Sequence, residues 1–138
     1  MNSALAMLPQ LVATVLLVAV ILFFPGGWNL TRCLGLAITA LAAVPFLVAR
    51  YQLGKSFSLN PRAKGLVTSG IYSRIRNPLY VFSTLMILGA VIAYQKWVLL
   101  IVPALLVGVQ AIRAHREARV LEAAFGDAYR EYRKTTWF

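Results

Sequence analysis

Acidic side chains are scarce in this sequence, and so are charged side chains in general. Asp and Glu number 4 against 14 Lys and Arg, and charged residues make up 13% of the chain, whereas a soluble domain has roughly a quarter. Hydrophobic residues make up 60%. The composition excludes an ordinary soluble domain. It predicts an all-α integral membrane bundle, because each span in hydrocarbon must satisfy its own backbone hydrogen bonds.

Cysteine and histidine each occur once, as Cys33 and His115. No Cys/His pair has metal-ligand spacing, and the sequence has neither a GxGxxG motif nor a P-loop. We therefore expect no metal site. Cys33 lies in an apolar run, where packing is its expected role.

Four apolar segments, at about residues 4–24, 32–49, 79–94 and 97–112, have the composition of membrane spans. The first run follows Met1 to Ser3, which offer no positive side chain, and further apolar sequence comes after it. We interpret it as a retained span rather than a signal peptide. A chain of 138 residues has room for one domain, 1–138, in which a loop at 50–78 separates the second and third spans.

Basic residues are distributed unequally about these spans. Arg32 and Lys96 lie on one side, and all others lie in the 50–78 loop or the C-terminal segment. By the positive-inside rule this predicts a multi-pass protein with the loop and both termini in the cytoplasm. We expect it in the inner membrane of a bacterium. Anionic membrane lipids explain the basic charge better than nucleic acid does, so no nucleic-acid partner is expected, and no particular oligomeric state is indicated.

The C-terminal segment 113–133 has small and apolar residues at steps of three or four, from Ala114 to Tyr132. This periodicity predicts an amphipathic helix, which either continues the fourth span or lies in the membrane interface. Arg113 and Glu117 stand four residues apart where the last span leaves the membrane. They form either a surface ion pair worth a few tenths of a kcal/mol or a functional pair at the membrane boundary.

Polar residues also surround the start of the third span, in the stretch GLVTSGIYSRIRNPLYVF, residues 65–82. The free N–H groups at a helix N-terminus suit a carboxylate or a phosphate. Tyr72, Arg76, Asn77 and Tyr80 therefore form either a ligand site or an ordinary Tyr/Arg belt at the membrane interface.

Together, two motifs resemble the isoprenylcysteine carboxyl methyltransferase family, which is itself similar to the phospholipid methyltransferases. The resemblance covers about residues 50–137 in order and spacing. It departs from the family at Asn77, where histidine is usual, and at Ala118, where a second glutamate is usual. The first motif is Leu66, Val67, Gly70 and Tyr72 followed by Arg76, Asn77, Pro78 and Tyr80, and the second is Glu117, Leu121, Phe125, Gly126, Tyr129 and Tyr132.

The resemblance implies methyl transfer from S-adenosylmethionine, with S-adenosylhomocysteine as product, to a lipophilic acceptor at the cytoplasmic membrane face. The acceptor would be the carboxylate or amine of a prenylated or phospholipid-type molecule. Arg113 and Glu117 are the implied catalytic residues: Arg113 would fix an anionic group of the acceptor, and Glu117 would orient either the acceptor or the cofactor, or act as base for an amine. The implied cofactor-binding residues are Gly70, Tyr72, Arg76, Asn77, Pro78, Tyr80, Phe125, Tyr129 and Tyr132.

Two other functions are compatible with parts of the sequence. A catalytically degenerate member of the same family would bind cofactor or lipid without turnover, which the changes at Asn77 and Ala118 favour. An exporter of the small four-span multidrug kind would need an acidic residue inside a span. The four predicted spans contain none, which argues against the exporter.

Overall fold

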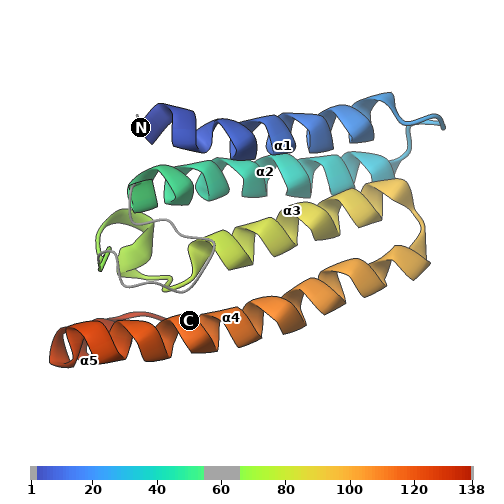
Figure 1. Ribbon diagram of the computed structural model, residues 1–138. Coiled ribbons are helices and arrows are strands. Elements are labelled where there is room, and N and C mark those ends of the chain that lie inside the picture. Colours follow the sequence, from blue (N-terminus) through green and yellow to red (C-terminus); the bar gives the residue numbers. More distant parts are fainter. Residues whose placement is uncertain (1–2, 55–65, 138) are drawn as a thin grey trace.

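The computed structural model describes residues 3–54 and 66–137, which form helices joined by turns (Figure 1). This described part of the chain contains no β-strand, so the predicted all-α class is confirmed. The α-helices are α1 (Ser3–Phe23), α2 (Leu30–Leu53), α3 (Pro78–Tyr94), α4 (Ile101–Phe125) and α5 (Asp127–Thr135), with short 3-10 helices η2 (Gly70–Ser73) and η3 (Trp97–Leu100).

The helices follow the predicted spans closely, but not at every end. α1 and α3 begin and end within one residue of the spans predicted at 4–24 and 79–94. α2 starts earlier than predicted because Asn29 caps it: its side-chain oxygen accepts a hydrogen bond from the backbone N–H of Arg32 at 2.9 Å. α2 also continues to Leu53, so the first residues of the predicted 50–78 loop are helical. Residues 55–65 of that loop lie outside the described residues.

Two stretches are long and apolar enough to cross a membrane, Leu30–Leu53 and Trp97–Phe125. Met7–Phe23 and Pro78–Tyr94 are shorter apolar helices. Of the four predicted spans, the second and fourth therefore have full spanning length. Crossing by α1 and α3 stays a prediction, as do the positions of the termini.

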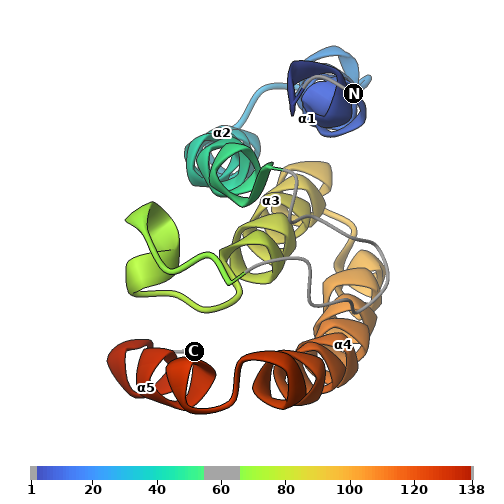
Figure 2. The ribbon, with the colours of Figure 1, turned by 60° about the vertical axis from the view of Figure 1, so that its left-hand side comes forward.

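The helix predicted at 113–133 continues the fourth span, as one of the two alternatives expects, but it is two helices and not one. α4 continues the fourth span without a break as far as Phe125, and Gly126 then ends it. Gly126 adopts a φ of +51°, a conformation that residues with a Cβ rarely adopt, and its N–H donates to the carbonyl of Glu122 at 2.9 Å. The chain turns at this glycine, and α5 comes to lie near η2 (Figure 2).

The most extensive helix contact joins α2 and α3, because small residues let the two backbones approach. A Cβ added at Gly35 would lie 2.5 Å from the carbonyl oxygen of Gly89, and one added at Gly89 would lie 2.5 Å from Oγ1 of Thr39. The Thr39 hydroxyl is also within hydrogen-bond distance of the Met86 carbonyl oxygen, at 3.1 Å. Small residues and Ser/Thr hydrogen bonds are typical of helix contacts inside membranes.

The helices gather their connections at two ends of the bundle (Figure 1). We call one the turn end; it comprises the link 24–29 between α1 and α2, the first turn of α2, and the link 95–100 between α3 and α4. The other, the motif end, comprises the last turn of α2, residues 66–80, the second half of α4, and α5. Both motifs singled out in the sequence therefore lie at the same end of the molecule.

Candidate functional site

The start of α3 is shaped by its local sequence. Pro78 is the first residue of the helix, where its missing N–H removes no helical hydrogen bond. Asn77 occupies the capping position, but its side chain makes no capping hydrogen bond. The start of α3 therefore leaves the Asn77 amide available for another role.

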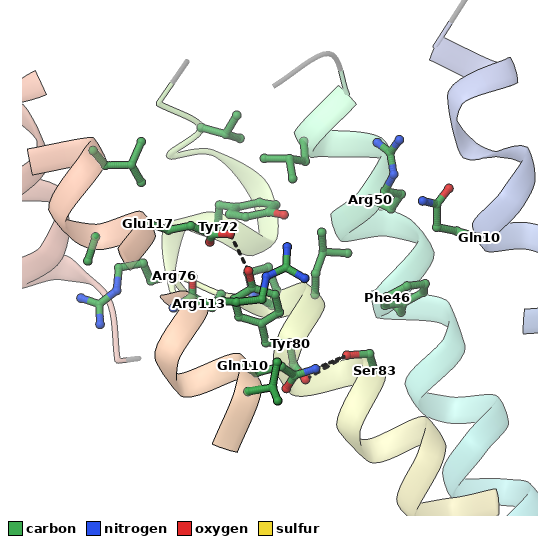
Figure 3. A pocket seen from close by; sticks show the side chains of 18 of the residues that line it. Gln10, Phe46, Arg50, Tyr72, Arg76, Tyr80, Ser83, Gln110, Arg113 and Glu117 are labelled. Carbon is green, nitrogen blue, oxygen red and sulfur yellow. Dashed lines mark hydrogen bonds between the residues drawn. The ribbon is translucent and has the colours of Figure 1, made fainter. Parts of the chain in front are cut away.

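Tyr80, in the first turn of α3, connects the two residues that the sequence singles out on α4 (Figure 3). Its hydroxyl donates a hydrogen bond to Oε1 of Glu117 at 2.5 Å. The guanidinium carbon of Arg113 lies 5.7 Å from the centre of the Tyr80 ring, within the range of a cation–π interaction. Arg113, Glu117 and Tyr80 therefore form one cluster between two helices.

A cavity of about 360 Å³ lies beside this cluster, which is within the range of about 300–1,000 Å³ typical of small-molecule sites. Nine of the eleven predicted site residues line it, so the fold brings the two motifs together around one space. Among the residues that the structure describes, the lining consists of Gln10, Phe46, Arg50, Leu53, Val67, Tyr72, Arg76, Asn77, Pro78, Leu79, Tyr80, Ser83, Leu106, Val109, Gln110, Arg113, Glu117, Ala118, Leu121, Tyr129 and Tyr132.

Three tyrosines form an aromatic wall where η2 meets α5. The hydroxyl of Tyr132 donates to the backbone carbonyl of Tyr72 at 2.7 Å, and Tyr129 is fully buried beside it. The hydroxyl of Tyr72 is also buried, and it makes no hydrogen bond with any residue that the structure describes. Burial raises the pKa of Tyr72, and it raises the pKa of Tyr132 to about 12. Both phenols therefore stay protonated at neutral pH and can donate hydrogen bonds.

Several polar residues in the cavity were not predicted from the sequence. Gln110 of α4 accepts a hydrogen bond from Thr84 at 2.8 Å and donates one to Ser83 at 3.0 Å. Gln110 and Ser83 line the cavity, as do Gln10 of α1 and the buried Arg50 of α2. Their signal in the sequence is an amide, hydroxyl or charge within an otherwise apolar span, where polar side chains usually face protein rather than lipid.

Two predicted site residues, Gly70 and Phe125, are not among the lining residues. Gly70 adopts a φ of +62°, and a Cβ there would collide with the side chain of Gln52. That same side chain accepts a hydrogen bond from the N–H of Ile71 at 2.8 Å. Gly70 therefore lets η2 pack against α2, which positions Tyr72. Phe125 ends α4, directly before the turn at Gly126.

Charge in the cavity is predominantly positive. Arg50, Arg76 and Arg113 line it together with one carboxylate, that of Glu117. Among the residues that the structure describes, no cluster of three or more His, Cys, Asp or Glu could hold a metal ion. The lining therefore suits an organic ligand that has aromatic and anionic parts.

The described part of the chain thus combines two helices long and apolar enough to cross a membrane with a cavity at the motif end. The sequence profile of the phospholipid methyltransferase family matches residues 30–128, which include α2, α3, α4 and the Tyr80–Arg113–Glu117 cluster. The chain therefore belongs to the phospholipid methyltransferase family, which confirms the similarity to the phospholipid methyltransferases that the motifs indicate. No curated protein matches the chain significantly. Family membership and the two helices of spanning length indicate a membrane methyltransferase.

Proposed function

We propose that this protein transfers the methyl group of S-adenosylmethionine to a lipophilic acceptor whose reacting group is an amine or a carboxylate. The observation that carries the proposal is the cavity at the motif end, in which both family motifs surround Tyr80, Arg113 and Glu117. Methyl transfer is supported by membership of the family. The reaction takes place at the cytoplasmic face of the membrane in this proposal.

The cofactor occupies the side of the cavity bounded by η2, the start of α3 and α5. The aromatic wall of Tyr72, Tyr129 and Tyr132 offers ring faces against which an adenine base can stack. Arg76 and Asn77 line the cavity and offer hydrogen-bond donors to its polar groups. Asn77 can donate and accept hydrogen bonds as histidine does, but it cannot titrate.

The residues on α4 act on the acceptor. When bound, the cofactor supplies a methyl group on a positively charged sulfur, and the electrons of the broken bond remain on that sulfur. In-line attack on such a methyl group depends mainly on positioning. Arg113 fixes an anionic group of the acceptor, while Glu117, held by the Tyr80 hydroxyl, orients the reacting group.

The chemical type of the acceptor decides which residue matters more. An ammonium group must lose a proton before its lone pair can attack, and Glu117 is the carboxylate in the cavity lining that can take this proton. A carboxylate acceptor attacks through an oxygen atom that is already unprotonated. It needs no base, and Arg113 then holds the reacting group itself.

A second candidate is a family member that binds cofactor or lipid without transferring a methyl group. Ala118 lines the cavity beside Glu117, so the lining has one carboxylate where the family usually has two. Asn77, at the other side of the same cavity, replaces the usual histidine. These two substitutions are the reason to test binding and turnover separately.

Calorimetric titration of the detergent-purified protein with S-adenosylhomocysteine tests cofactor binding. Incubation of the protein with methyl-labelled S-adenosylmethionine and a membrane extract tests turnover and identifies the acceptor from the labelled product. We expect saturable binding and one labelled lipophilic product. Absence of binding would contradict the methyltransferase proposal, and binding without label in any lipid fraction would favour the second candidate.

A further inference from the structure

Two buried polar residues face the α2 side of the cavity and take no part in the Tyr80–Arg113–Glu117 cluster. Arg50, near the end of α2, is 2% exposed, and Tyr72, in η2, is 5% exposed, yet both line the cavity. Nη1 of Arg50 donates to the carbonyl of Gly54 at 3.2 Å, which anchors the guanidinium at the helix end. A cation and a phenol thus line the same cavity.

The Tyr72 hydroxyl is a donor with no hydrogen-bond partner among the described residues. Such a group lowers the stability of a folded protein, and its retention in a cavity wall gives a reason to look for a ligand. Figure 3 shows this hydroxyl directed toward the side of the cavity where Arg50 and Gln10 lie. Because burial raises the pKa of Tyr72, the phenol keeps its proton. Its hydroxyl can therefore donate a hydrogen bond to an oxygen atom of a ligand.

The surroundings of Arg50 indicate the chemistry of that acceptor. Phe46 and Leu53, on the same helix, line the cavity together with it. A buried guanidinium in a lining that also contains apolar side chains suits an anionic oxygen on a lipophilic molecule, since charge-assisted hydrogen bonds are strong where water is excluded.

We propose that Arg50 and Tyr72 form an anion subsite that binds a phosphate or carboxylate oxygen of the lipophilic acceptor. Arg50 supplies the charge, and Tyr72 donates a hydrogen bond to the same group. The subsite is separate from Arg113 and Glu117, which remain at the reacting end of the molecule. The identity of the ligand as an acceptor rests on the proposed function, whereas the affinity for an anionic amphiphile does not.

Tyr72→Phe is the most direct test, because it removes one oxygen atom that has no partner in the described protein. The probe is hexadecyl phosphate, titrated calorimetrically into the protein in a neutral detergent, with the uncharged hexadecyl glycerol ether as reference. We expect Tyr72→Phe to weaken hexadecyl phosphate binding about tenfold, the size of one hydrogen bond to an anion. Its melting temperature stays equal or rises, and binding of the ether does not change.

Arg50→Gln is the second variant, and Arg74→Gln is its matched control. Arg74 is exposed, lies two residues after Tyr72 and is absent from the cavity lining. We expect Arg50→Gln to lose at least as much affinity for hexadecyl phosphate as Tyr72→Phe, and Arg74→Gln to lose none. Wild-type affinity in Tyr72→Phe, or an equal loss in Arg74→Gln, would overturn the subsite. If Arg50→Gln does not fold, Tyr72→Phe decides alone.

Titration of the same variants with S-adenosylhomocysteine separates two sources of the anion. If they lose affinity for S-adenosylhomocysteine but not for hexadecyl phosphate, the site binds the cofactor carboxylate and the assignment to the acceptor is wrong. Because these are binding measurements, they do not depend on turnover. The two proposals can therefore fail separately. If hexadecyl phosphate binding requires Tyr72 but the protein transfers no methyl group, the proposed function is wrong and the anion subsite is still supported.

Discussion

The two ends of the bundle contain hollows of similar size but different chemistry. The hollow at the turn end measures about 350 Å³, and the cavity at the motif end about 360 Å³. At the turn end Arg32 is 3% exposed, and its guanidinium carbon lies 4.4 Å from the centre of the Trp28 ring. Its N–H groups donate to four carbonyl oxygens around the end of α1, those of Ile21, Leu22, Phe24 and Gly26.

The side-chain amides beside Arg32 also have hydrogen-bond partners within the protein. The amides of Asn29 and Gln95 exchange two hydrogen bonds of 3.1 and 3.0 Å across the two turns. At the motif end, in contrast, the Tyr72 hydroxyl has no partner among the described residues, and Asn77 makes no capping bond. Volume therefore does not distinguish a site from a packing feature. The two are distinguished by whether their polar groups already have hydrogen-bond partners within the protein, because a donor that is used by the fold is not available to a ligand.

The largest effect that would test this comparison is expected from Arg32→Ala. Several carbonyls at the end of α1 would lose their donor at roughly 1–3 kcal/mol each, so we expect the free energy of unfolding to fall by about 3–5 kcal/mol. Denaturant unfolding in detergent measures it. The folded fraction should bind S-adenosylhomocysteine as the wild type does. Arg32→Lys, which keeps the charge, should lose less, and an unchanged stability in Arg32→Ala would show that Arg32 does not hold the turn end together.

At the motif end, Glu117→Gln and Arg113→Ala should lower activity and leave the stability of the protein almost unchanged. We expect each to lower turnover at least about 100-fold, the lower limit for loss of an acid–base or charge-positioning group, while the melting temperature changes little. Methyl transfer measured with labelled cofactor checks this. The matched controls are Glu131→Gln and Arg116→Ala, at exposed positions outside the cavity lining. Normal turnover in either site variant would reduce the pair to an interfacial contact.

The smallest effects compare two asparagines that each precede a helix. Asn29 caps α2 and Asn77 does not cap α3. We expect Asn29→Ala to lower the free energy of unfolding by about 1 kcal/mol without changing the affinity for S-adenosylhomocysteine. Asn77→Ala should change stability by less than about 0.5 kcal/mol and weaken S-adenosylhomocysteine binding about tenfold. The reverse pattern would contradict the assignment of the two ends.

The two motifs supply ten of the 21 described residues that line the cavity, because residues such as Tyr72, Tyr80 and Glu117 have a spacing that the family shares. Gln110 and Arg50 were missed, since an isolated amide or arginine in an apolar run has no partner visible in the sequence. Gln110 finds its partners 26 and 27 residues away on α3. The sequence also does not predict the break at Gly126, although the Phe-Gly pair at this position belongs to one of the motifs. The continuous helix is predicted from the spacing of apolar residues. That spacing contains no information on the backbone dihedral angles of Gly126, whose positive φ ends the helix.

The sequence by itself determined the all-α class, the positions of the apolar helices and the family, because composition, periodicity and motif spacing are local along the chain. Only the tertiary structure decided which polar groups serve the fold and which face a cavity. Tyr80 reaches Glu117 across 37 residues, and Tyr132 reaches the carbonyl of Tyr72 across 60. Such hydrogen bonds depend on the distance between helices, which chain order alone does not specify. For that reason Arg32 and Arg50, alike in the sequence as arginines at the ends of one apolar helix, differ in their surroundings: Arg32 donates to backbone carbonyls at the turn end, and Arg50 lines the cavity at the motif end.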